Sequence, residues 1–167
     1  GIHLGADHHR RWEEYLKTHA VNAASSVTAA AAVKLYTGGG SADLEGFANE
    51  MLSAVEFRDK LSKVNDTVAA RIFELAEGDA LAGIVCTGGG GTAEEFAAFE
   101  TVSPEKAEEI AEKLRKRIEK RKRDFEGYIP EEMPKLENAL VEVRGNCAVM
   151  CVSDDNDAAR SVIDKYF

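Results

Sequence analysis

From residue 42 onward, apolar and polar positions repeat with the periods of regular secondary structure. Apolar residues recur every three or four positions in three segments, as on the buried face of an amphipathic α-helix; these segments are 44–55, 66–75 and 104–125. Ser103 and Pro104 are typical of a helix N-cap and first turn, and Gly127 is typical of a helix end. A last helix is predicted after the polar break at 153–155.

Other segments have the pattern of β-strands. Residues 81–86 form an apolar run that ends at a threonine and four glycines, as expected for a buried strand. Residues 138–144 and 147–152 predict a hairpin that turns at Gly145 and Asn146. This turn sets apolar residues opposite one another and predicts a core face; the pairs are Val143 with Ala148, Val141 with Met150, and Ala139 with Val152. The other face of the hairpin is a mixture of charged, apolar and cysteine residues.

Residues 1–40 differ from the rest of the chain. All four histidines lie there. Residues 10–36 contain good helix formers and no proline, and the glycine-rich residues 37–41 predict a flexible break. We therefore expect an N-terminal extension over 1–40, helical or linker-like, and a single folded domain over 41–167.

Charge narrows the classes of partner. The 167 residues include 30 acidic and 21 basic ones, which gives a net charge of −9 and disfavours binding to nucleic acid. The stretch 113–123 is an exception, because it holds eight basic residues and one acid. A solvated helix face explains this run most simply, since acids fill the first half of the same helix and suit its dipole. Binding of a polyanion by the 113–123 helix remains an alternative.

The glycine-rich loop at 87–92 invites comparison with phosphate-binding loops. Glycines allow backbone amides to approach an anion closely. The loop lacks the signature lysine of a nucleotide-binding loop and does not meet the spacing of a dinucleotide fingerprint. A flexible hairpin loop is the simpler interpretation, and a phosphate- or nucleotide-handling enzyme or sensor remains an alternative.

The folded part of the chain offers few groups for catalysis. Residues 42–167 contain no histidine, so a Cys–His or Ser–His pair cannot form within them. Cys147 and Cys151 lie on one predicted strand, ~13 Å apart, which is too far for a disulfide. Cys86 could pair with either one if its strand were adjacent. Carboxylates are abundant, but those at 131–132 and 154–155 are expected to be solvated, and we predict no catalytic residues, metal site or cofactor.

The order of motifs in the second half of the chain is more specific than any one of them. A long charged helix is followed by aromatic, proline and turn residues and then by an acidic break before the final helix; the residues concerned are Arg117, Phe125, Tyr128, Pro130, Asn138, Ala139, Gly145 and Asn146. This order resembles an uncharacterised family of bacterial envelope lipoproteins, catalogued as domain of unknown function 4358, over about residues 42–167. The resemblance implies export and attachment by a lipidated cysteine. From the resemblance we expect an extracytoplasmic domain of the cell envelope. Because we identify neither a signal peptide nor a lipobox in the sequence, we expect contact with a membrane only through a lipid anchor outside this chain.

The resemblance also decides one local conflict. Residues 92–95 form a capping-box pattern, and the residues after them have good helix propensity, so local rules predict a helix. The resemblance instead implies a strand over 96–101 that returns from the glycine loop. The resulting expectation is an α+β fold: a small, mostly antiparallel sheet in β-β-α-β-β-α order, with two preceding helices and the N-terminal helical extension.

The function implied is binding rather than catalysis. We expect a non-enzymatic binding or protein-interaction module whose partner is an unidentified protein or small molecule, with no role for nucleic acid. Tyr128 is the most distinctive local residue, and Arg117 and Arg121 precede it on the same helix. These three residues are the predicted binding site, with the tyrosine as an aromatic rim and the arginines as anion contacts.

Overall fold

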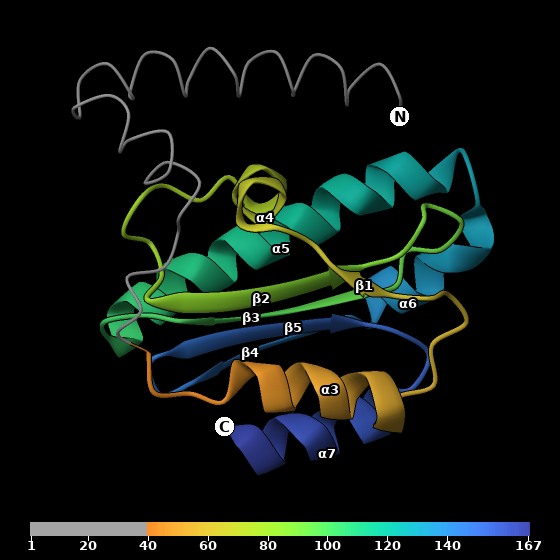
Figure 1. Ribbon diagram of the computed structural model, residues 1–167. Helices are drawn as coiled ribbons and strands as arrows, with labels where there is room; N and C mark the ends of the chain where they lie inside the picture. Colours follow the sequence, from red (N-terminus) through yellow and green to blue (C-terminus); the bar gives the residue numbers. More distant parts are fainter. Residues whose placement is uncertain (1–39) are drawn as a thin grey trace.

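The computed structural model describes residues 40–167 and shows an α+β fold, as predicted. The predicted extension over 1–40 lies almost wholly outside the described residues. Helices and strands follow one another along the chain (Figure 1) in this order: α3 (Leu44–Ala54), β1 (Ser62–Lys63), α4 (Asp66–Phe73), β2 (Ala82–Thr87), β3 (Glu95–Glu100), α5 (Pro104–Glu126), the 3-10 helix η1 (Pro130–Glu132), α6 (Met133–Glu137), β4 (Leu140–Arg144), β5 (Cys147–Val152) and α7 (Asn156–Tyr166).

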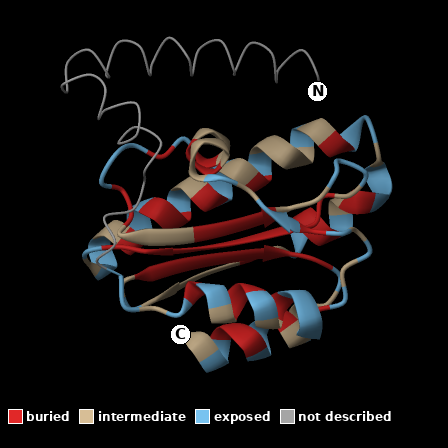
Figure 2. Ribbon diagram, in the orientation of Figure 1, coloured by how far each residue is buried: buried red, intermediate tan, exposed pale blue. Residues whose placement is uncertain are grey.

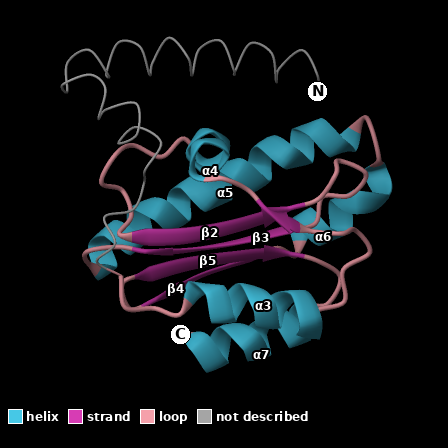
Figure 3. Cartoon of the chain, viewed as in Figure 1, coloured by secondary structure: helices cyan, strands magenta, loops and turns pink. Residues whose placement is uncertain are grey.

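The strands form one antiparallel sheet in the order β1-β2-β3-β5-β4. Helices cover both of its faces: α4, α5 and α6 lie on one side, and α3 and α7 on the other (Figures 1 and 3). Every residue of β3 and β5 is buried between these layers (Figure 2). The sheet therefore separates two hydrophobic clusters, and neither of its faces is exposed to solvent as one face of many antiparallel sheets is.

The C-terminal hairpin confirms most of the predicted register and corrects the prediction for its second face. Val143 pairs with Ala148 and Val141 with Met150, as expected, whereas β4 begins at Leu140 and leaves Ala139 outside the ladder. The face predicted to be mixed is also packed in its apolar part, because α3 and α7 cover it; its buried members are Leu140, Cys147, Val149 and Cys151.

Strand β3 shows how tertiary pairing overrides local propensity. The strand implied by the family resemblance is present and begins at Glu95, and the helix favoured by local rules is absent. Paired with β2 and β5 on its two sides, β3 places Phe96 in one hydrophobic cluster and Phe99 in the other. Its terminal carboxylates have partners: Glu100 accepts hydrogen bonds from the backbone N–H groups of Ser41 and Ala42, at 3.0 and 2.7 Å.

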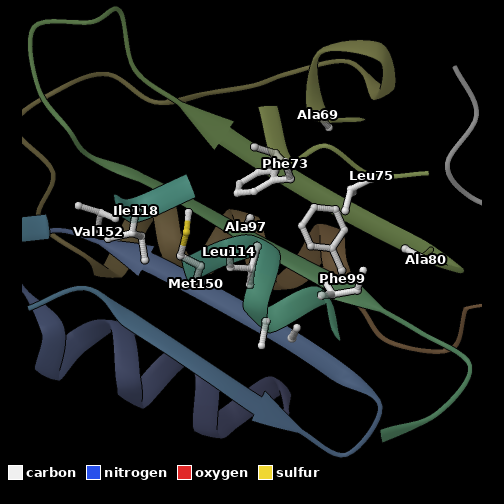
Figure 4. Packing of buried hydrophobic residues seen from close by; sticks show 14 of the residues in the cluster. Ala69, Phe73, Leu75, Ala80, Ala97, Phe99, Leu114, Ile118, Met150 and Val152 are labelled. Carbon is white, nitrogen blue, oxygen red and sulfur yellow. The ribbon is translucent and has the colours of Figure 1, made fainter. Parts of the chain in front are cut away.

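Helix α5 is the largest helix described, and it begins and ends as predicted. The Ser103 hydroxyl accepts a hydrogen bond from the backbone N–H of Lys106, and the helix stops at Gly127. Leu114 and Ile118 pack in the hydrophobic cluster on this side of the sheet, where Figure 4 shows them beside Ala97, Met150 and Val152. This packing fixes the rotation of α5 about its axis and so decides which of its basic residues face outward.

The register also answers the question of disulfide pairing. Cys86 and Cys151 both lie opposite Phe96, one on each neighbouring strand. Two strand spacings separate them, roughly 9–10 Å, which exceeds the reach of a disulfide. All three cysteines are free and buried.

Candidate functional site

The predicted site residues on α5 are engaged with the end of the sheet. Glu95 is completely buried, and Arg117 forms two hydrogen bonds with its carboxylate, at 2.9 and 3.1 Å. Arg121 lies 3.5 Å from the same carboxylate. Burial alone would raise the pKa of Glu95, but the two guanidinium groups outweigh it and hold this pKa below its ordinary value. The structure thus brings Arg117 and Arg121 together on a buried anion.

Tyr128 is not part of that arrangement. Its side chain is exposed just beyond the end of α5, and its ring contacts Phe125 with a centroid distance of 6.1 Å. The guanidinium group of Arg121 lies over the same Phe125 ring, 5.0 Å from its centre. Phe125 therefore links Tyr128 to Arg121, while the aromatic rim and the arginine pair do not form one open surface.

An open groove lies between α4 and the second half of α5. Its volume is about 1000 Å³, and seven basic and four acidic side chains line it, together with Ile72 and Phe73; the charged residues are Arg71, Glu74, Glu112, Lys113, Arg115, Lys116, Arg117, Glu119, Lys120, Arg123 and Asp124. Most of the basic side chains come from the stretch 113–123. Of the three predicted site residues, only Arg117 lines the groove.

The two walls of the groove are tied together at one end. Lys113 donates a hydrogen bond to the backbone oxygen of Glu74, at 2.8 Å, and also binds the Asp79 carboxylate at 2.9 Å. Glu74 follows α4 and has a left-handed backbone conformation, with φ of 53°. The lysine therefore satisfies a carbonyl group at the C-terminal end of α4, where the helix dipole favours a cation.

A second charged cluster is buried under the glycine loop, and the sequence did not indicate it. Lys135 is 3% exposed and binds both Glu94 and Glu132, with N–O distances of 3.0 to 3.1 Å. Burial opposes the charge of Lys135, yet its hydrogen bonds with Glu132 and Glu94 raise its pKa above the ordinary value. The same carboxylates accept backbone hydrogen bonds, Glu132 from Ala93 and Glu94 from Asp59.

This cluster corrects the expectation that the carboxylates at 131–132 are solvated. Glu131 is exposed, but Glu132 is 6% exposed because η1 and α6 turn it toward β3. The sequence holds no local signal for this arrangement. Glu94 lies in the capping-box pattern at 92–95, and Lys135 lies in a segment interrupted by two prolines.

The glycine loop already has a carboxylate beside it. The Asp59 side chain accepts hydrogen bonds from the backbone N–H of Gly89, at 3.2 Å, and from the Thr92 hydroxyl, at 3.1 Å. A β-carbon on Gly88 would lie 2.1 Å from the same Asp59 oxygen, so the Asp59 side chain would have to move and its hydrogen bonds with the loop would be disturbed. The anion that contacts this loop is thus the protein's own Asp59.

The three cysteines are buried, and burial changes their acidity. Burial raises the pKa of Cys86 and Cys147 to about 11 and that of Cys151 to about 12, so their thiols are protonated at neutral pH. Among residues 40–167 no cluster of three or more His, Cys, Asp or Glu side chains is arranged to hold a metal ion. None of the helices in this part of the chain combines the length and apolar character of a membrane span.

Comparison with known families confirms one part of the resemblance, the domain of unknown function 4358. Residues 53–153, more than half of the chain, match the family described as Domain of unknown function (DUF4358). The chain belongs to this family. The DUF4358 match runs from the end of α3 to the residue after β5, so it contains the complete sheet, the groove and the buried charge cluster. No curated protein and no solved structure matches the chain.

Proposed function

We propose that this DUF4358 protein is a binding module that holds an anionic ligand or partner in the groove between α4 and α5 and does not transform it. The groove itself carries the proposal. It is open and roomy, and basic side chains outnumber acidic ones in its lining, although the whole chain has a net charge of −9. A local basic surface can attract an anion even when the total charge of the protein is negative.

Within residues 40–167, the lining of the groove offers no nucleophile–base pair of the Cys–His or Ser–His kind, which supports binding over nucleophilic catalysis. Its lining residues are lysines, arginines, carboxylates and two apolar residues, with no cysteine, serine or histidine among those described. The arginine that faces both the groove and the sheet, Arg117, is held by Glu95 and is therefore fixed in position.

Thermal shift measurements with small anions of different chemistry test this proposal. Tripolyphosphate, citrate and a hexaglutamate peptide would be added to the wild type, to a Lys116→Glu, Arg123→Glu groove variant and to a Lys60→Glu, Arg160→Glu control. The control makes the same change of charge at exposed positions outside the groove. We expect an anion to stabilise the wild type and the control but not the groove variant. Equal responses of all three proteins, or none, would refute the proposal.

A location in the cell envelope is the second part of the proposal, as the resemblance to envelope lipoproteins suggests. Any contact with a membrane would then run through a lipid anchor outside residues 40–167. Fractionation of the native host, with mass spectrometry for a lipid-modified cysteine on the full-length gene product, tests this part. Recovery of unmodified protein in the cytoplasmic fraction would contradict it.

The glycine loop at 87–92 receives less support as a phosphate site. Its Gly89 amide is already bonded to Asp59, and a phosphate at the same position would meet this carboxylate. Two like charges at hydrogen-bond distance repel strongly unless one of them is neutralised.

A further inference from the structure

The basic residues of the groove form a stripe along one side of α5. Lys116, Lys120 and Arg123 are spaced by four and three residues, which places them on the same side of a helix over ~10 Å. All three line the groove, and Arg71 of α4 lines it as well. Lys116 and Arg123 are exposed, and neither forms an ion pair with another residue of the range 40–167. Lys116 and Arg123 therefore offer two cations that the described part of the protein does not neutralise.

Acidic side chains border this stripe and restrict what can bind to it. Glu112, Glu119 and Asp124 project from the same helix into the lining, and Glu74 closes the end of α4. A nucleic acid strand presents a phosphate at every nucleotide, and several of these would meet the bordering carboxylates. A peptide whose acidic residues are separated by uncharged ones can pair each carboxylate with a cation of the groove. Its uncharged residues then lie beside the acidic side chains of the lining.

The floor of the groove is apolar but offers no aromatic stacking surface. Phe73 is 2% exposed, and the guanidinium group of Arg117 covers its ring at 5.9 Å from the ring centre. Proteins that bind single-stranded nucleic acids usually stack the bases on exposed aromatic rings. Ile72 is half-buried in the lining and can contact an aliphatic side chain instead. A concave site of this kind also fits a narrow segment better than the flat surface of a lipid bilayer.

On the basis of the proposed function, we infer that the occupant of the groove is a short acidic segment of a partner protein. Its carboxylates would pair with Lys116 and Arg123, and an aliphatic side chain between them would rest on Ile72. Such contacts depend on exposed charges, so binding should weaken as the ionic strength rises.

Fluorescence anisotropy with three labelled probes tests the inference. The probes are a short peptide of Glu and Asp with a central Leu, a single-stranded oligothymidylate of the same charge, and vesicles that contain phosphatidylglycerol. Each is titrated into the wild type, the Lys116→Glu, Arg123→Glu variant and the Lys60→Glu, Arg160→Glu control. We expect the wild type and the control to bind the peptide most tightly, and the groove variant to lose about tenfold or more in affinity.

The possible outcomes separate the two proposals. Tighter binding of the oligonucleotide or the vesicles, lost in the groove variant, would overturn the acidic segment as the ligand and leave the groove as a binding site. Peptide binding that the groove variant retains would also overturn the inference. If no probe shows binding that depends on the groove, both the inference and the proposed function fail.

Discussion

Replacing Lys135 with methionine tests whether the buried charge cluster acts as one unit. The substitution removes the single cation between Glu94 and Glu132 while roughly keeping the volume of the side chain. Two buried carboxylates would then lack their shared partner. Breaking a buried ion pair in this way costs about 3–5 kcal/mol, which is roughly a fifth or more of the stability of a typical domain.

Urea unfolding followed by circular dichroism measures this cost from the midpoint and the slope. Lys122→Met is the matched control, because Lys122 pairs with Glu119 at 3.0 Å on a more accessible part of α5. Loss of that pair should cost about 0.5 kcal/mol or less. A Glu94→Gln, Glu132→Gln, Lys135→Met variant, in which no buried charge is left unpaired, should be more stable than Lys135→Met alone.

The pH dependence gives a second check on the same reasoning. Lys135 has a raised pKa, so its stabilising contribution is complete below its unfolded pKa and is lost as the pH rises through the folded pKa. The difference in stability between the wild type and Lys135→Met should therefore shrink when the pH is raised through the folded pKa of Lys135. A cost below about 1 kcal/mol at neutral pH would refute the interpretation of a dry, coupled cluster, since that value is typical of solvated pairs.

Three other predictions concern the sheet and its loop. Gly88→Ala should destabilise the protein because its β-carbon would meet Asp59, whereas Gly89→Ala, with open space around it, should cost little in the same urea assay. Because the pKa of Glu95 is lowered, its contribution to the free energy of unfolding is present above the unfolded pKa and is lost as the pH falls through the folded pKa. The difference in stability between the wild type and Glu95→Gln should therefore shrink on acidification. A difference that stays constant with pH would contradict the ion pair. The three buried thiols should react slowly with an aromatic disulfide reagent in the native state and rapidly in guanidinium chloride, and fast native reaction would show that the strands open readily.

The parts of the fold that follow from local rules were predictable from the sequence. The N-cap at Ser103 and the turn at Gly145 depend on residues within a few positions, and the structure has both where expected. The strand at β3 is different. Only its position between two other strands explains why a helix-favouring segment is extended, and no local pattern contains that information.

The candidate site could be predicted only in part for the same reason. The basic stretch 113–123 is obvious in the sequence, but the packing of Leu114 and Ile118 decides which of its residues face the groove and which face the sheet. Arg117 and Arg121 were expected to meet an external anion, and the structure gives them Glu95 instead. The cluster around Lys135 joins residues about forty positions apart, so it depends on the topology alone.

Because α3 and α7 cover one face of the sheet, a truncated form of the protein that lacks them should behave differently from the complete domain. A fragment cut to the matched residues 53–153 would retain the complete sheet but lose nearly all of α3 and the whole of α7. Phe96, Val149 and Cys151 would then face water on a broad apolar plane, a state that invites self-association. The smallest piece expected to remain soluble alone is therefore larger than the part that the family shares, and it should extend from about residue 40 to Phe167.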